Sequence, residues 1–162
     1  MDLAPAVPYV ADLEAELLAA YPQLTRRLAL VLRDSVEAED VAQSAFARAM
    51  EKRSRFGGGD ARAWLYTIAL RLAFNELRRK RQTARPNFTE EPAWAMETDP
   101  DLWLALDRLE VRHRAALLLH VIDGYSHEEI ARMLGVRTGT VSSWLSRGRA
   151  RLRQILGAPD DE

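Results

Sequence analysis

The sequence predicts an all-α protein of two small helical domains joined by an acidic linker, with a helix-turn-helix in the second domain. Strand signals are nearly absent: the chain has no sustained alternation of apolar and polar residues, and no Asn-Gly or Asp-Gly hairpin turn between strand-like runs. Apolar residues recur instead with the period of a helix. The 162 residues are 48% hydrophobic, which is enough to pack one ordinary domain or two small ones.

The first domain is predicted over residues 9–82 and opens with two helices. Residues 9–33 carry leucines at helical spacing. Residues 35–51 follow Asp34 or Ser35, either of which can act as the N-cap. Acidic residues fill the first turns of this second helix, where the helix dipole favours negative charge.

A glycine-rich loop and a basic helix complete the first domain. Residues 53–60 contain three successive glycines, so we expect a flexible loop rather than a helix. Asp60 is the expected N-cap of a third helix over residues 61–82. The end of that helix carries a cluster of Arg and Lys residues.

Residues 83–101 are rich in Pro, Glu, Asp and Thr and are predicted to form the linker. Phe88, Trp94 and Met96 are too apolar for a mere spacer, and they either pack on one domain or dock in a partner's channel. The second domain is predicted over residues 102–156. Its four helical segments are 102–109, 111–123, 126–134 and 138–156.

The last two of these segments have the pattern of a helix-turn-helix. Ser126 and Glu129 can form a capping box at the start of the first helix, and Gly135 can adopt the left-handed turn at its end. Val141, Leu145 and Leu152 point inward from the second helix, whose other faces carry Thr, Ser and Arg but no acid. This combination favours insertion into a DNA major groove, whereas a helical hairpin with a solvated cationic face is the simpler alternative.

Charge is segregated along the chain even though the net charge is only −1. Residues 61–86 contain seven Lys or Arg and one acid, and residues 131–156 contain six Arg and no acid. Residues 87–111, between them, contain seven acids and one Arg. Two cationic surfaces can therefore face phosphate while the whole molecule stays near neutrality.

The sequence argues against an enzyme. The chain has no cysteine and no Walker, nucleophile-elbow or dinucleotide-binding motif. Its histidines, His113, His120 and His127, are seven residues apart, and the first two would lie roughly 10 Å apart on a helix, too far to share a metal easily. We expect no catalysis, cofactor or metal. No signal peptide or span of ~20 apolar residues is evident, so we expect a cytoplasmic protein without membrane insertion.

Three segments together resemble the extracytoplasmic-function (ECF) sigma factors of bacterial RNA polymerase. They are VEAEDVAQSAFARAM (36–50), AWLYTIALRLAFNELRRKR (63–81) and GTVSSWLSRGRARL (139–152). The resemblance extends over about residues 9–156. It implies a region 2 domain and a region 4 domain that bind core RNA polymerase and promoter DNA, and family habit adds an anti-sigma factor.

The resemblance also implies roles for individual residues. The residues expected to bind core polymerase are Glu39, Asp40 and Gln43. Those expected to open and hold the downstream promoter element are Arg53, Arg55, Phe56, Trp64, Arg71, Asn75, Arg78 and Arg79, because strand capture needs a cationic groove and stacking surfaces. Those expected to contact the upstream element as duplex are Arg137, Thr138, Thr140, Ser143, Arg147, Arg149 and Arg151.

The chain departs from the family pattern at a few positions. Ser142 and Trp144 stand where basic residues are common, and Leu70 and Arg71 occupy a site that often reads Arg-Asn. Gly148 replaces a usual alanine and is expected to weaken its helix by ~1 kcal/mol. Two other functions stay open: a sigma-like adaptor that sequesters an anti-sigma protein without directing transcription, and a free-standing repressor, which leaves the first domain unexplained.

Overall fold

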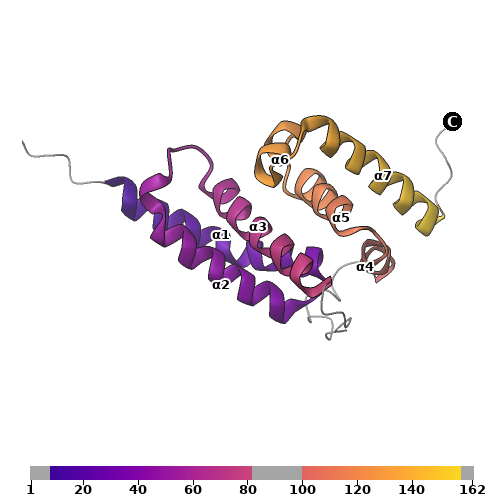
Figure 1. Ribbon diagram of the computed structural model, residues 1–162, viewed down its shortest axis with the longest axis horizontal. Coiled ribbons are helices and arrows are strands. Elements are labelled where there is room, and N and C mark those ends of the chain that lie inside the picture. Colours follow the sequence, from indigo (N-terminus) through magenta and orange to yellow (C-terminus); the bar gives the residue numbers. More distant parts are fainter. Residues whose placement is uncertain (1–7, 82–99, 158–162) are drawn as a thin grey trace, which may run out of the picture.

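The computed structural model describes residues 8–81 and 100–157, and within these ranges every regular element is a helix (Figure 1). The predicted all-α class is therefore confirmed. The N-terminal bundle contains α1 (Pro8–Leu32), α2 (Ser35–Glu51), a 3-10 turn (Arg53–Arg55) and α3 (Ala61–Arg81). The C-terminal bundle contains α4 (Pro100–Asp107), α5 (Val111–Leu117), a π-helical turn (Leu118–Ile122), α6 (His127–Leu134) and α7 (Thr138–Leu156).

The predicted linker falls almost entirely outside the described residues. The apolar linker residues Phe88, Trp94 and Met96 lie outside the described residues. Helix α4 begins at Pro100, two residues before the predicted start of the second domain. The boundaries 9–82, 83–101 and 102–156 stay predictions.

Local side-chain chemistry fixes where several helices begin. Asp34 accepts a hydrogen bond from the Glu37 amide at 3.0 Å, which makes it, rather than Ser35, the N-cap of α2. Asp60 accepts from the Ala63 amide at 3.1 Å at the start of α3. The 53–60 segment is part helix, because its first residues form the 3-10 turn before the glycines.

The predicted helix-turn-helix is present with both of its local signals. Ser126 Oγ accepts from the Glu129 amide at 3.1 Å, and the Ser126 amide donates to the Glu129 carboxylate at 2.7 Å. Gly135 ends α6 in the left-handed region at φ 67°, where its missing Cβ removes the steric penalty. Together these contacts satisfy amide and carbonyl groups at both ends of a helix of only eight residues.

The core of the N-terminal bundle takes a broad face of α3. The buried residues on this helix include Leu65, Tyr66, Ala69, Leu70 and Ala73. Leu70, only 1% exposed, belongs to this core, which explains why an apolar residue stands at that position. The remaining contributions are mostly leucine and alanine from α1 and α2: Leu17, Leu24, Leu28, Val31, Ala38, Ala42, Ala45 and Ala49.

Gly148 lies where α7 crosses α5 at close range. A Cβ at this position would lie 2.7 Å from Leu117 Cδ1 and 3.2 Å from Leu117 Cγ. Glycine therefore permits the close packing of the two helices, and this gain offsets its poor helix propensity.

We expect Gly148→Ala to lower the free energy of unfolding by about 1 kcal/mol, because overpacking costs roughly 1–3 kcal/mol and exceeds the ~1 kcal/mol gain in helix propensity. Gly139, also in α7, is the matched control, since no atom lies within 4 Å of the position its Cβ would take. Gly139→Ala should therefore be neutral or stabilising by up to ~1 kcal/mol. Urea unfolding of both variants checks this, and equal gains in stability would contradict the packing argument.

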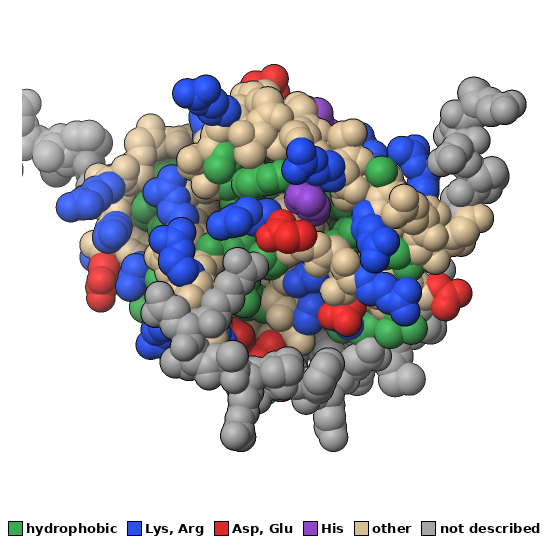
Figure 2. Space-filling view, turned by 45° about the vertical axis from the view of Figure 1, so that its right-hand side comes forward, with side chains coloured by type: hydrophobic (Ala, Val, Ile, Leu, Met, Phe, Trp, Pro, Cys, Tyr) green, Lys and Arg blue, Asp and Glu red, His purple; other side chains and the backbone are tan. Residues whose placement is uncertain are grey.

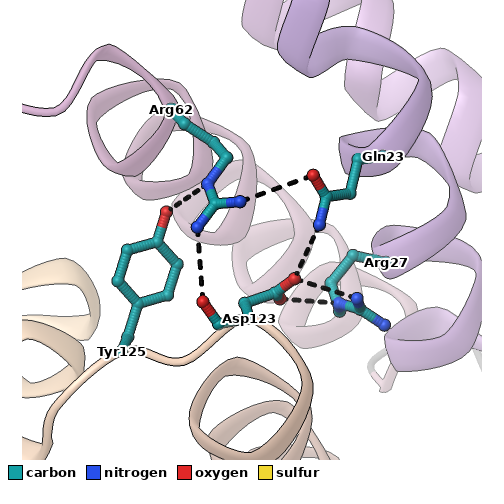
Figure 3. Close-up of polar contacts among 5 residues, drawn as sticks. All are labelled: Gln23, Arg27, Arg62, Asp123 and Tyr125. Carbon is teal, nitrogen blue, oxygen red and sulfur yellow. Dashed lines mark hydrogen bonds and ion pairs between the residues drawn. The ribbon is translucent and has the colours of Figure 1, made fainter.

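The two bundles pack against each other through a polar cluster (Figure 3). Asp123, which follows the π-helical turn, accepts hydrogen bonds from Arg27 of α1 at 2.7 and 2.9 Å. Gln23 of α1 donates to the same carboxylate at 3.2 Å. Arg62 of α3 donates to the Tyr125 hydroxyl at 2.9 Å and to the Asp123 carbonyl at 3.3 Å. The Asp123 side chain is fully buried, so its charge is compensated by Arg27.

A second set of contacts joins the end of α1 to the C-terminal bundle. Arg114 of α5 is buried and donates to three backbone carbonyls, those of Val31, Leu106 and Leu109. Arg33 has a φ of 58°, forms an ion pair with Asp107 at 3.0 Å, and its guanidinium lies 3.5 Å from the ring centre of Trp103. The C-terminus of α1 is thus fixed by groups that come from α4 and α5.

Candidate nucleic-acid interface

The helix-turn-helix presents the start of α7 to solvent. Arg137 and Thr138 are exposed and Thr140 is half-buried, while Val141 and Leu145 are buried beneath them. The predicted upstream-contact residues at this end are therefore brought together at the tip of one helix. Such a helix end is the part that reaches base edges in a helix-turn-helix.

Ser142 and Trp144 are turned into the hairpin. Ser142 Oγ donates to the Thr138 carbonyl at 3.2 Å and forms a hydrogen bond with His127 Nδ1 at 2.9 Å. Trp144 is half-buried and packs against the hydrophobic core. Ser142 thus contacts α6, whereas Trp144 contributes to the packing of the core.

The second half of α7 supplies positive charge. Arg147, Arg149 and Arg151 are exposed, and Arg151 also donates to Gln154 at 3.4 Å. Ser143 is half-buried. Figure 2 shows Lys and Arg side chains over both the left and the right of one face of the molecule, with few acidic side chains among them.

A second surface combines the glycine loop with the start of α3. Arg53 and Arg55 are exposed in the 3-10 turn. The rings of Phe56 and Trp64 lie 5.2 Å apart with a tilt of 44°, and both residues are half-buried. Trp64 thus packs against the core of the bundle and also forms an aromatic pair with the loop.

The exposed side of α3 carries the remaining predicted downstream-contact residues. Arg71, Asn75 and Arg78 are exposed at spacings of four and three residues, which places them on one face. Arg79 differs, because it pairs with Glu76 at 2.8 Å and lines a groove between α2 and α3.

This groove, of about 540 Å³, contains Asp40 from the predicted polymerase-binding set. Glu37 lies in the same groove and pairs with Lys80 at 2.9 Å, and this hydrogen bond raises the pKa of the Lys80 ammonium. Glu39 and Gln43 are exposed on α2. Sequence periodicity did not single out Glu37 or Lys80, because their pairing joins residues 43 positions apart on two helices.

Two of the three histidines lie close together although they are seven residues apart in the sequence. The rings of His120 and His127 lie 4.9 Å apart, because the chain reverses between the π-helical turn and α6. Within the described ranges no group of three or more His, Cys, Asp or Glu side chains could hold a metal ion. Among the same residues, no helix is both long and apolar enough to cross a membrane.

The comparisons with known proteins agree with this geometry. A family model described as sigma-70 region 2 matches residues 17–83, and one described as sigma-70 region 4 matches residues 101–152. The ECF RNA polymerase sigma factor EcfG of Rhodopseudomonas palustris is 32% identical over 95% of this chain and 92% of its own length. The chain belongs to the ECF family of sigma factors. The ECF sigma factor SigE of Mycolicibacterium smegmatis is 32% identical over 91% of this chain, which spans 63% of that relative's length.

A solved sigma-factor structure has the same fold. The sigma factor RpoE of Bartonella quintana, solved in complex with the anti-sigma factor NepR, is 29% identical with a TM-score of 0.80. The match covers 92% of this chain and 99% of that chain. In the present chain, the region 2 match contains the glycine loop and the surface of α3. The region 4 match contains most of the helix-turn-helix.

Proposed function

We propose that this chain binds core RNA polymerase in the cytoplasm, brings it to a promoter and helps to melt the downstream promoter element, without catalysing a reaction itself. The observation that carries the proposal is the presence of two cationic surfaces of different kinds on separate bundles. One is a helix-turn-helix, suited to duplex DNA. The other joins basic side chains to an aromatic pair, suited to a single strand.

The roles follow from the chemistry of each surface. Arg137, Thr138 and Thr140 approach base edges of the upstream element, and Arg147, Arg149 and Arg151 hold its phosphates. Phe56 and Trp64 offer stacking surfaces to unpaired bases, while Arg53, Arg55, Arg71 and Arg78 hold the strand and Asn75 makes a directional contact to a base edge. A basic helical segment of the polymerase contacts Glu39, Asp40 and Gln43. Arg79 lines the groove between α2 and α3 that also contains Asp40.

The decisive experiment is in vitro transcription with core polymerase and genomic fragments, with mapping of the start sites. Specific initiation that depends on the added chain is expected. Loss of specific initiation, together with tight binding of an anti-sigma protein, would favour the adaptor function instead. An anti-sigma factor is itself a proposed partner, supported by the solved relative in complex with NepR.

We expect Arg71→Ala combined with Arg78→Ala to reduce promoter opening by about 10-fold or more, because a hydrogen bond to a charged group contributes roughly 1.5–3 kcal/mol. Affinity for core polymerase should change little, since both side chains lie outside the groove between α2 and α3. Permanganate reactivity of unpaired thymines measures opening, and fluorescence anisotropy measures core binding. Arg26→Ala with Arg48→Ala is the charge-matched control, because both residues are exposed on the same bundle.

Equal losses of opening and core binding in the Arg71/Arg78 variant would count against this division of roles. Arg79→Ala offers the reciprocal test. Because Arg79 lines the groove with Asp40, its loss should alter core affinity more than opening.

A further inference from the structure

Arg62 is a basic residue of α3, the helix proposed to hold single-stranded DNA, and its side chain contacts the C-terminal bundle. It lies in the first turn of α3, two residues before Trp64. Its guanidinium donates to the Tyr125 hydroxyl at 2.9 Å, the Asp123 carbonyl at 3.3 Å and Gln23 Oε1 at 3.5 Å (Figure 3). It also lies 5.1 Å from the centre of the Tyr125 ring.

All of these acceptors are neutral. The buried Asp123 carboxylate is taken by Arg27 and Gln23, so Arg62 reaches only the backbone oxygen of that residue. Among the described residues, no carboxylate oxygen lies within 4.0 Å of the Arg62 guanidinium. A phosphate would be a stronger acceptor, because it adds the attraction between opposite charges and can accept two parallel hydrogen bonds from one guanidinium.

The chain connectivity permits the bundles to separate. Eighteen residues lie between the end of α3 at Arg81 and the start of α4 at Pro100. A chain of that length can extend to about 60 Å. The contacts of Figure 3, rather than the covalent linker, therefore hold Arg62 against the segment from Asp123 to Tyr125.

We propose that this segment and single-stranded DNA compete for Arg62. In the closed arrangement the C-terminal bundle occupies the guanidinium; when the bundles separate, Arg62 joins the basic surface of α3 and binds a phosphate of the captured strand. Arg62 is thus a further DNA-binding residue, and its release couples strand capture to separation of the bundles. The inference rests on the proposed function, since it assumes that α3 holds a single strand.

The absence of native cysteines allows the arrangement to be measured directly by energy transfer between two dyes. Ala47→Cys on α2 and Leu104→Cys on α4 place the dyes on exposed positions, one on each bundle. High transfer is expected for the free chain. A labelled single-stranded oligodeoxynucleotide of about 12 nucleotides, within the range of known site sizes, should lower the transfer as it binds.

Asp123→Asn should lower the transfer without DNA, because it removes the charge that pairs with buried Arg27. If the closed form is about 90% populated, opening should raise apparent affinity for the oligonucleotide by up to about 10-fold, the limit at which the closed form does not bind. Tyr125→Phe removes only the hydroxyl that accepts from Arg62, so it should lower the transfer and raise the affinity to a smaller extent. This milder variant keeps the test valid if Asp123→Asn unfolds the protein. Glu128→Gln is the control, since it removes an exposed acid from the same bundle.

A double-mutant cycle isolates Arg62. Arg62→Ala should also lower the transfer, yet it should not raise DNA affinity. In the Asp123→Asn background, Arg62→Ala should abolish most of the gain in affinity for the oligonucleotide. In the native background, Arg62→Ala should change that affinity little, because the C-terminal bundle already occupies the guanidinium.

The inference is wrong if the oligonucleotide binds the native chain without lowering energy transfer, or if the gain in the Asp123 variant matches that of Glu128→Gln or survives loss of Arg62. Failure of every variant to bind the oligonucleotide, with transfer still lost in the Asp123 variant, would instead contradict the proposed strand-handling function. Energy transfer thus separates failure of the closed arrangement from failure of the DNA-binding function.

Discussion

Replacing Arg114 with alanine is expected to lower the free energy of unfolding by about 3–5 kcal/mol, because each buried acceptor left without a donor costs roughly 1–3 kcal/mol. The carbonyls of Val31 and Leu109 lose this donor, whereas the carbonyl of Leu106 keeps the Leu109 amide as a donor. Burial, followed by the nearby charge of Arg33, lowers the pKa of the Arg114 guanidinium to about 10, so the side chain is still protonated at neutral pH. The stability that it contributes should be independent of pH near neutrality.

Urea unfolding of matched variants measures this effect. Arg112→Ala, on the exposed side of the same helix, should change stability by no more than about 0.5 kcal/mol. Arg114→Lys should recover only part of the loss, because an ammonium cannot reproduce the planar fork that reaches carbonyls of α1 and of the α4–α5 connection. A loss in Arg114→Ala as small as that in Arg112→Ala would mean that the end of α1 is not fixed by α5.

Local chemistry made much of the fold predictable. The capping box of α6 and the glycine that ends α6 depend on residues within four positions of one another, so the sequence alone identifies them. For α2 the sequence narrows the N-cap to Asp34 or Ser35, and the structure selects Asp34. The contact between the bundles could not be found in this way. Arg27 and Asp123 are 96 residues apart, and each on its own is typical of a solvated helix surface or a loop.

The candidate site was predictable in composition and less so in orientation. Residue types and spacing identified the basic face of α3, but adjacent residues on a helix point about 100° apart. Arg78 and Arg79 therefore face different surfaces, and periodicity over a broad basic cluster does not separate them. The inward orientation of Ser142 likewise could not be predicted, because it depends on a contact with His127 that forms only when α6 packs against α7.

Loss of the aromatic pair formed by Phe56 and Trp64 is expected to impair promoter opening strongly. Stacking of a base on an aromatic ring contributes roughly 1–3 kcal/mol, so Phe56→Leu and Trp64→Leu should each reduce open-complex formation by about 10-fold. Leucine keeps apolar bulk and removes the flat π-face, which limits the effect on folding. Duplex binding through the helix-turn-helix should persist, because these rings lie on the N-terminal bundle.

Phe46→Leu is the matched control for this prediction. Phe46 is also a half-buried aromatic residue of the N-terminal bundle, and its ring packs edge-on against Tyr21 at 6.0 Å. Its replacement should therefore cost similar stability without affecting opening. If all three variants lose opening in proportion to their loss of stability, the Phe56–Trp64 pair only packs the loop. A loss confined to Phe56 and Trp64 variants would mean that the rings act on unpaired bases, because stability alone cannot distinguish them from Phe46.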